Sequence, residues 1–219
     1  MIKEKVESLI AMTDRQFGYY QVKLDPLKDK IPKDEVTYLI DESITCGKEL
    51  AKELRQMYGE ITTRELIERL DLNLTIKDTN TTLEYVYFGT FQPPNQITLY
   101  EKNIEPGANL LQSFALKEFE QIETADVVLA HELFHYFEEN NPKLFINRYQ
   151  IELWKVLGYT RRSGLIATSE IAAMAFAKEW LNLSFNVNLL DYVLLQPFNP
   201  ELADNIWSAM MGGVENESE

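Results

Sequence analysis

Cysteine is nearly absent from this sequence, and histidine is rare. Cys46 is the only cysteine among 219 residues, and the chain has two histidines. A single cysteine excludes an internal disulfide framework and a zinc site built from cysteines. We therefore expect Cys46 to be a small structural residue in the core or at the surface.

Long hydrophobic runs are also missing. No apolar stretch is long enough to span a bilayer, and the first residues, MIKEKVES, lack the apolar core of a signal peptide. The hydrophobic content of 45% is ordinary for a globular protein, and the length suits one sizeable domain or two small ones. These features predict a cytoplasmic protein.

Positive charge is in short supply. The chain has 21 lysines and arginines against 35 aspartates and glutamates, which gives a formal net charge of −14. Nucleic acid phosphates would be repelled by most of such a surface, which argues against direct binding to DNA or RNA. A basic partner or a basic substrate segment would be attracted, although solubility alone is the simpler explanation of the acidity.

Both histidines fall in one short motif, His-Glu-Leu-Phe-His at residues 131–135. A helix places positions i and i+4 on one face, so His131 and His135 could bind one zinc ion together. Glu132 would lie beside that metal, where it could accept a proton from a bound water as general base. The alternative is a buried helix whose two histidines are satisfied by hydrogen bonds, and the apolar flanks of the motif suit both hypotheses.

The acidic residues nearest to the motif are poor candidates for a third zinc ligand. Glu138 lies about 10 Å along the helix from His131, whereas all ligand atoms must come within about 2 Å of a zinc ion. We expect Glu138 and Glu139 to form a solvated helix end. Asp126 and Glu152 remain open as ligands, but no feature of the sequence favours them.

Glu170 is the better candidate for the third ligand. It lies in the helix-forming segment TSEIAAMAFA at 168–177, where Ala173 and Ala177 share its face. Small side chains beside the acid would let this helix approach the motif helix closely. The alternative is an alanine-rich core helix in which Glu170, near the start, is stabilised by the helix dipole.

Together, the two segments resemble the ImmA/IrrE-type metallopeptidases. In that family a zinc-binding His-Glu-x-x-His helix is followed by a helix of the pattern Glu-x-x-Ala-x-x-aromatic-Ala. The second pattern is matched here by Glu170, Ala173, Phe176 and Ala177. The order of the upstream elements is similar as well, so the resemblance covers about residues 35 to 185.

The resemblance implies a zinc metallopeptidase that hydrolyses a peptide bond of a protein substrate. It implies that His131, His135 and Glu170 bind the zinc ion and that Glu132 is the catalytic base. Members of the family often act on a transcriptional repressor, so a repressor is one candidate partner.

Peptide hydrolysis also needs a hydrogen-bond donor for the developing oxyanion. With both histidines used as ligands, the candidates are Tyr149, Tyr159, Arg161 and Arg162 in an expected loop at 141–165, and the sequence does not choose among them. Two hypotheses compete with a peptidase. One is a non-catalytic protein-interaction domain with a structural or vestigial metal site, and the other is a structural zinc whose open position is blocked by a side chain.

Hydrophobic periodicity and turn signals predict an α+β fold with a mainly helical body. We expect a helix at 3–13, a loop containing Gly18, and helices at 33–58 and 63–70. Strands are expected at 72–77, 83–91 and 96–100, forming a small antiparallel meander beside the motif helix. An edge strand of this sheet could pair with an extended peptide.

The C-terminal half is expected to be helical around the motif. We expect a connector at 101–120 with a helical stretch at 110–119, then the motif helix, which Asn140-Asn141-Pro142 would end. An apolar segment at 185–198 and a last helix at 200–211 would follow, with a disordered acidic tail at 213–219. We expect one domain over 1–212, and its parts are a helical part (1–70), the sheet (71–100), the metal-binding helices (121–184) and a C-terminal cover (185–212).

Overall fold

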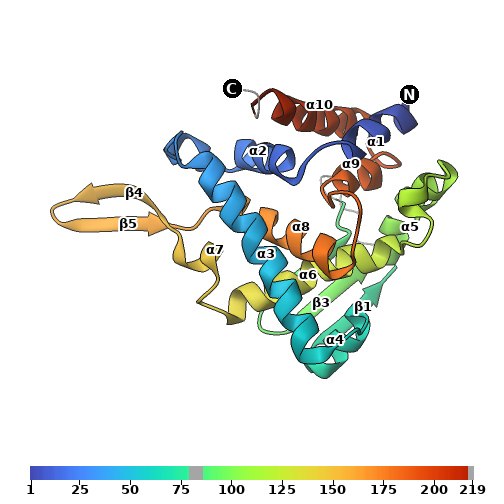
Figure 1. Ribbon diagram of the computed structural model, residues 1–219, viewed down its shortest axis with the longest axis horizontal. Coiled ribbons are helices and arrows are strands. Elements are labelled where there is room, and N and C mark those ends of the chain that lie inside the picture. The colour runs from blue at the N-terminus through green and yellow to red at the C-terminus, as the bar shows by residue number, and fades with distance from the viewer. Residues whose placement is uncertain (79–85, 217–219) are drawn as a thin grey trace.

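The computed structural model describes residues 1–78 and 86–216, and in this part of the chain it is an α+β protein (Figure 1). Helices form the body, and a small three-stranded sheet lies on one side of it. The expected fold class is therefore confirmed. Every helix in the described residues is too short or too polar to cross a membrane.

The N-terminal part contains four α-helices and one short 3-10 helix. They are α1 (Ile2–Ile10), α2 (Asp14–Leu24), η1 (Lys28–Lys30), α3 (Val36–Tyr58) and α4 (Thr63–Arg69). A capping box begins α4, where the Thr62 hydroxyl accepts a hydrogen bond from the Glu65 backbone N–H at 3.2 Å. Gly59 ends α3 with a φ of +76°.

Helix α2 occupies the segment that we expected to be a loop. Gly18 suggested a turn, but it lies inside α2, and a Cβ atom there would come within 2.3 Å of the Ile40 side chain. The glycine therefore allows a close approach between α2 and α3. Tertiary packing overrides the local turn signal at this position.

The sheet contains β1 (Asn73–Lys77), β2 (Gly89–Gln92) and β3 (Gln96–Tyr100), in the order β1-β3-β2. Strands β2 and β3 are antiparallel, but β1 pairs with β3 in parallel, so the antiparallel meander was a wrong prediction. Strand β3 is the central strand, and most of its side chains, among them Ile97 and Leu99, are buried. Residues 79–85, which include the start of the expected strand at 83–91, lie outside the described residues.

The expected connector is mostly helical. Helix α5 (Glu101–Ser113) contains Pro106, and a short 3-10 helix, η2 (Lys117–Phe119), follows. A Cβ atom at Gly107 would lie 2.7 Å from the Leu194 side chain, so the glycine serves the packing of α5 on the C-terminal helices. Helix α5 begins at Glu101, about nine residues before the helical stretch that we expected at 110–119.

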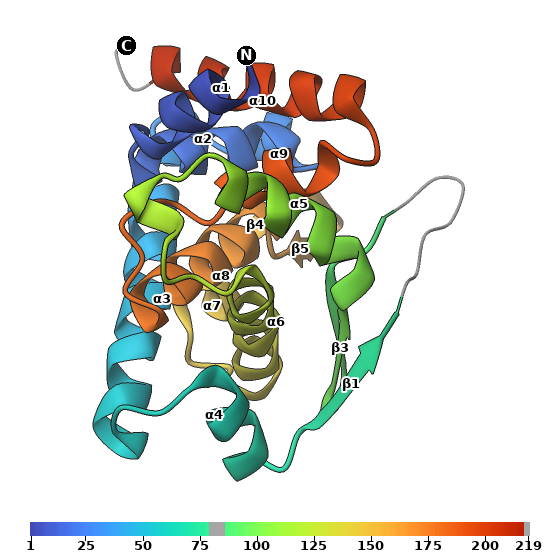
Figure 2. The same ribbon diagram turned by 90° about the vertical axis from the view of Figure 1, so that its right-hand side faces the viewer.

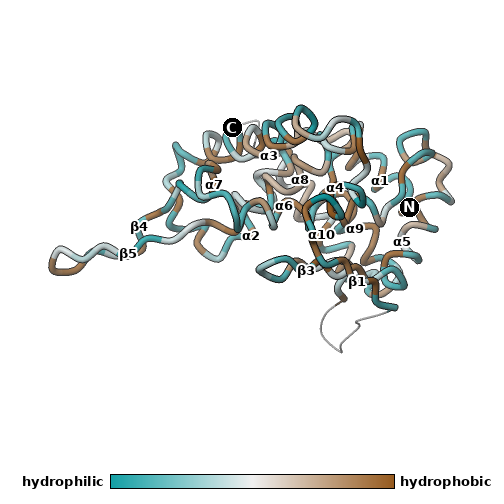
Figure 3. Tube along the Cα trace, turned by 90° about the horizontal axis from the view of Figure 1, so that it is seen from below, coloured by the Kyte–Doolittle hydropathy of each residue, from teal (hydrophilic) through white to brown (hydrophobic). Residues whose placement is uncertain are grey.

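The part that we expected to bind metal contains α6 (Thr124–Asn140), α7 (Phe145–Arg148), β4 (Ile151–Val156), β5 (Tyr159–Ser163) and α8 (Ile166–Trp180). The expected loop at 141–165 is thus a short helix and an antiparallel hairpin. The hairpin extends away from the body, and its tip is partly hydrophobic (Figures 1 and 3).

Helix α8 lies between α3 and α6, and the sheet covers the other side of α6 (Figure 2). Helix α3 can approach α8 closely because it carries Gly47, where a Cβ atom would lie 2.1 Å from the Ala172 carbonyl oxygen. Four alanines of α8 are buried in the same region, at positions 172, 173, 175 and 177. Cys46, beside Gly47, is buried, so of the two expected locations, core and surface, it occupies the core.

The C-terminal cover contains α9 (Leu189–Leu195) and α10 (Pro200–Asn216). These helices pack with α1 and α2, so both ends of the described chain lie on the same side of the molecule (Figure 2). Helix α10 continues past the expected end at Met211 into the segment expected to be disordered. Gly213 is buried there, and a Cβ atom would come within 2.4 Å of the Gln16 carbonyl oxygen, so packing on α2 extends the helix.

Candidate metal centre

The structure brings His131, His135 and Glu170 together. The two Nε2 atoms lie 3.3 Å apart, because a single turn of α6 separates the histidines. From α8, one carboxylate oxygen of Glu170 lies 3.5 Å from Nε2 of His131, and the other lies 3.9 Å from Nε2 of His135. All three ligand atoms lie within 4.8 Å of one another. One divalent cation could therefore contact all three residues.

The chemistry of this donor set fits zinc. Two imidazole nitrogens and one carboxylate are ligands of catalytic zinc sites, which leave a fourth position open. Burial and the charge of His135 lower the pKa of His131 to about 3, so the imidazole of His131 is neutral, as metal binding requires. Among the described residues, the buried Nδ1 atom of His131 has no hydrogen-bond partner.

His135 has a different environment. Burial alone would lower its pKa, but the hydrogen bond to Glu138 and the charges of Glu170 and Glu132 raise it instead. Burial raises the pKa of Glu170, with the Glu138 charge adding to the rise and His135 opposing it. Three carboxylates thus crowd around two imidazoles in a largely buried space, and a bound cation would compensate this negative charge.

We expected Glu138 to belong to a solvated helix end, and this prediction was wrong for Glu138. Its Oε2 atom lies 2.8 Å from Nδ1 of His135 and accepts a hydrogen bond from the Ser169 hydroxyl at 2.7 Å. The start of α8 covers this turn of α6, which explains why Glu138 is only partly exposed while Glu139 is exposed. A glutamate three residues after a ligand histidine was the signal in the sequence that could have revealed this contact.

Glu132 points to the side of α6 that faces β2. Its carboxylate accepts a hydrogen bond from the backbone of Phe91, and its side chain passes Gly89 so closely that a Cβ atom there would lie 2.7 Å from Cγ. Burial raises the pKa of Glu132 to about 7, with the Glu170 charge adding to the rise and His135 opposing it. A carboxylate with such a pKa can accept and return a proton near neutral pH.

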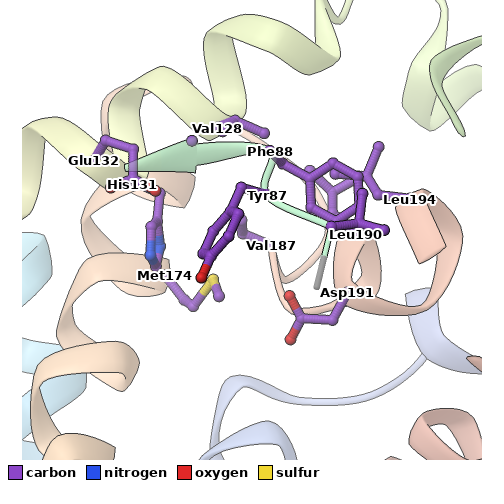
Figure 4. Close-up of a pocket in the computed structure, with 12 residues that line it drawn as sticks. Tyr87, Phe88, Val128, His131, Glu132, Met174, Val187, Leu190, Asp191 and Leu194 are labelled. Atoms are coloured by element: carbon purple, nitrogen blue, oxygen red, sulfur yellow. The ribbon is translucent and has the colours of Figure 1, made fainter. Parts of the chain in front are cut away.

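A cavity of about 230 Å³ opens beside Glu132 and His131 (Figure 4). It lies between β2, α6, α8 and α9, and most of its wall is apolar. Tyr87 and Asp191 are its other polar lining residues, and neither was expected to be functional. An acid inside the apolar run LLDYVLL was the available signal for Asp191.

The four expected oxyanion donors are not among the residues that line this cavity. Tyr149 donates a hydrogen bond to Glu35 at the start of α3, while Tyr159, Arg161 and Arg162 lie on β5 of the exposed hairpin. Tyr87 is closer to the site, because its ring stands beside His131 in the cavity wall (Figure 4).

The two other acids left open as ligands lie elsewhere. Asp126 is in the first turn of α6, where its Oδ1 atom lies 3.6 Å from Nε of Arg64. Glu152 is on β4, opposite Arg162 of the hairpin. Neither belongs to the cluster of His131, His135 and Glu170.

A comparison with known protein families finds no match, and comparisons with curated proteins and with solved structures find no significant match. The motif and the arrangement of these side chains are therefore the basis for a function.

Proposed function

We propose that this chain is a zinc-dependent metallopeptidase that hydrolyses a peptide bond of a protein substrate. The observation that carries the proposal is the convergence of His131, His135 and Glu170 on one point, with Glu132 beside them at the wall of an open cavity. A structural role alone would not require a buried acid with a pKa near neutrality next to that cavity.

The chain supplies the ligands, the base and the space for a substrate. Zinc bound by the two histidines and Glu170 would polarise the scissile carbonyl and lower the pKa of a bound water. Glu132 would accept the proton of that water and deliver it to the leaving amine. The Phe91 backbone N–H and the packing against Gly89 hold the Glu132 carboxylate in place for both transfers.

Tyr87 is the donor that we assign to the developing oxyanion. Its ring stands in the cavity wall beside His131, whereas Tyr159 of the hairpin is 78% exposed. A phenol that donates a hydrogen bond to the oxyanion would stabilise the transition state more than the ground state.

A blocked structural zinc site is less well supported than a catalytic one. Structural zinc sites usually have four protein ligands. Among the described residues, the ligand cluster contains three residues and no fourth histidine, cysteine or acid. The fourth position would therefore remain available to water or substrate.

The exposed hairpin favours one second candidate, a non-catalytic protein-interaction domain. Leu157 at its tip is 95% exposed, and Trp154 and Tyr159 are more than half exposed. Such apolar groups on a projecting hairpin are typical of contact surfaces for another protein. This hypothesis does not use Glu132, which gives a way to separate the two functions.

The test combines metal content with turnover. We expect about one zinc per chain in protein purified without added metal, measured by elemental mass spectrometry, and cleavage of an unfolded protein substrate. Glu170→Ala should lose the zinc, whereas Glu132→Gln should keep it and lose turnover. The matched control is Glu139→Gln, which changes an exposed glutamate of the same helix and should alter neither property.

Two results would contradict the proposal. A protein that contains no zinc and takes up none at neutral pH has no metal centre to activate water. Equal cleavage by Glu132→Gln and the wild type would mean that Glu132 is not the catalytic base. A zinc-loaded wild-type protein that cleaves no substrate would make the interaction domain the better hypothesis.

A further inference from the structure

The cavity beside Glu132 has the size of a pocket for one side chain. Its volume of about 230 Å³ is below the range of roughly 300–1,000 Å³ that holds a complete small-molecule ligand. It borders on His131 and Glu132, so a group inside it would be adjacent to the reacting bond. Its occupant would therefore be a side chain of the substrate.

The walls of the cavity suit an aliphatic stem. They are formed by valine, leucine, methionine and phenylalanine side chains from several segments of the chain, namely Val128, Met174, Val187, Leu190, Leu194 and Phe88. Burial of the methylene groups of such a stem against these walls is favourable because it removes apolar surface from water. The apolar walls alone would accept any large aliphatic side chain.

Asp191 makes one end of the cavity anionic. It projects from α9 on the side away from His131, with Tyr87 between the two in Figure 4. None of the described residues donates a hydrogen bond to its carboxylate. Apart from burial, the charge that raises the pKa of Asp191 comes from Glu170, which is itself an acid.

The described part of the lining carries no lysine or arginine to balance this acid. Among the described residues, the cavity wall contains Asp191 and Glu132 but no lysine or arginine. Burial and the Glu170 charge raise the pKa of Asp191 to about 7, which is the response of a carboxyl group that lacks a positive partner. A cationic group entering the cavity would supply that partner.

We propose that this cavity selects an arginine or lysine side chain of the substrate, whose stem lies along the apolar walls and whose cationic end pairs with Asp191. This inference rests on the proposed peptidase function, because it places the selected residue next to the cleaved bond. The net charge of −14 supports it, since an acidic surface attracts a basic segment.

The first arm of the test is cleavage. A library of unfolded peptides is digested with the zinc-loaded protein, and cleavage sites are mapped by mass spectrometry. We expect arginine or lysine at one position flanking the cut. Replacing that arginine by citrulline, its neutral analogue, should lower kcat/KM about tenfold or more, as expected for losing a hydrogen bond between charged groups.

Asp191→Asn should remove this preference and accept both peptides about equally. The variant should fold, because it replaces a partly buried carboxyl group by a neutral group of the same shape. Asp34→Asn is the control, since it changes the net charge equally at a position outside the cavity.

The second arm does not depend on activity. Binding of n-butylguanidinium and of n-butylurea, its neutral analogue, is followed by NMR chemical shifts of the full chain. We expect only the cation to shift signals of the cavity residues, and Asp191→Asn should weaken its binding about tenfold or more.

The outcomes separate the two proposals. Cleavage at neutral sites that Asp191→Asn leaves unchanged overturns the inference about the cavity but keeps the peptidase. Absence of cleavage together with Asp191-dependent binding of the cation overturns the peptidase but keeps the cation pocket. If the protein neither cleaves peptides nor binds the cation, both proposals are wrong.

Discussion

Nδ1 of His135 lies 2.8 Å from Oε2 of Glu138, one turn further along the same helix. The same carboxylate oxygen accepts the hydroxyl hydrogen bond of Ser169, which belongs to the helix that carries Glu170. The contact leaves Nε2 of His135 directed at Nε2 of His131 and at the carboxylate of Glu170. Glu138 therefore orients the imidazole of His135 and links α6 to α8, the helix that carries Glu170.

The first prediction is that Glu138→Gln weakens zinc binding by about 10- to 100-fold, the usual effect of removing a carboxylate that orients a ligand histidine. The measurement is competition for zinc with a chelator of known affinity. Glu139→Gln is the control, because Glu139 is exposed on the same turn of the helix. Equal zinc affinities of Glu138→Gln and the wild type would show that Glu138 does not position His135.

The second prediction concerns the contact between α3 and α8. In Gly47→Ala the new Cβ atom would lie 2.1 Å from the Ala172 carbonyl oxygen and 2.8 Å from the Phe176 nitrogen. Both are backbone atoms, so relief requires the helices to separate, and we expect the free energy of unfolding to fall by about 3 kcal/mol. Alanine is a better helix former than glycine by about 1 kcal/mol, but this gain is smaller than the cost.

The measurement is urea denaturation, compared with Gly164→Ala, because a Cβ atom at Gly164 meets nothing within 4 Å. Zinc affinity should fall together with stability in Gly47→Ala, because α8 carries Glu170. A Gly47→Ala protein as stable as the control would mean that α3 and α8 do not need this close contact.

The sequence predicts those parts of the site whose contacts form between residues that are close along the chain. The pairing of His131 with His135 follows from helix periodicity alone. The place of Glu170 needs the packing of two helices separated by a hairpin, and the spacing alone left it open until a family pattern was considered. Glu138 was missed because its neighbour Ser169 lies 31 residues later in the chain.

The fold shows the same division. Helices α3 and α4 were predicted because their caps and periodicity are local. The parallel pairing of β1 with β3 requires a crossover connection between the two strands. The alternation of apolar and polar residues along a strand does not indicate such a connection. Asp191 was overlooked for a related reason, since only the tertiary packing of α9 places that acid at the cavity.

The third prediction tests the oxyanion donor. Tyr87→Phe should lower kcat about 100-fold without changing zinc content, because a lost oxyanion hydrogen bond costs about that much in rate. Tyr159→Phe is the control, since that tyrosine is on the exposed hairpin and should have no effect. The reverse result, with activity lost only in Tyr159→Phe, would move the donor to the hairpin and require it to fold over the site.

The last prediction uses the pKa of Glu132 in the metal-free protein. An ordinary glutamate, as in the unfolded chain, titrates near 4.5, whereas burial raises the pKa in the folded protein to about 7. As the pH rises between these values, the unfolded state loses its proton first, so the folded state is progressively destabilised. The full cost, about 3 kcal/mol, is reached above pH 7 and vanishes below pH 4.5.

Glu132→Gln removes this proton equilibrium. The metal-free variant should therefore be more stable than the wild type at about pH 8, by an amount of the order of 3 kcal/mol, while the difference should disappear at about pH 4.5. Urea denaturation of both proteins at a series of pH values measures it, with Glu139→Gln expected to follow the wild type because that side chain is exposed. A constant difference in stability between Glu132→Gln and the wild type at every pH would mean that Glu132 titrates in the folded protein as it does in the unfolded chain. Such a carboxylate would be fully ionised at neutral pH, and it would be a weaker base for the proposed reaction.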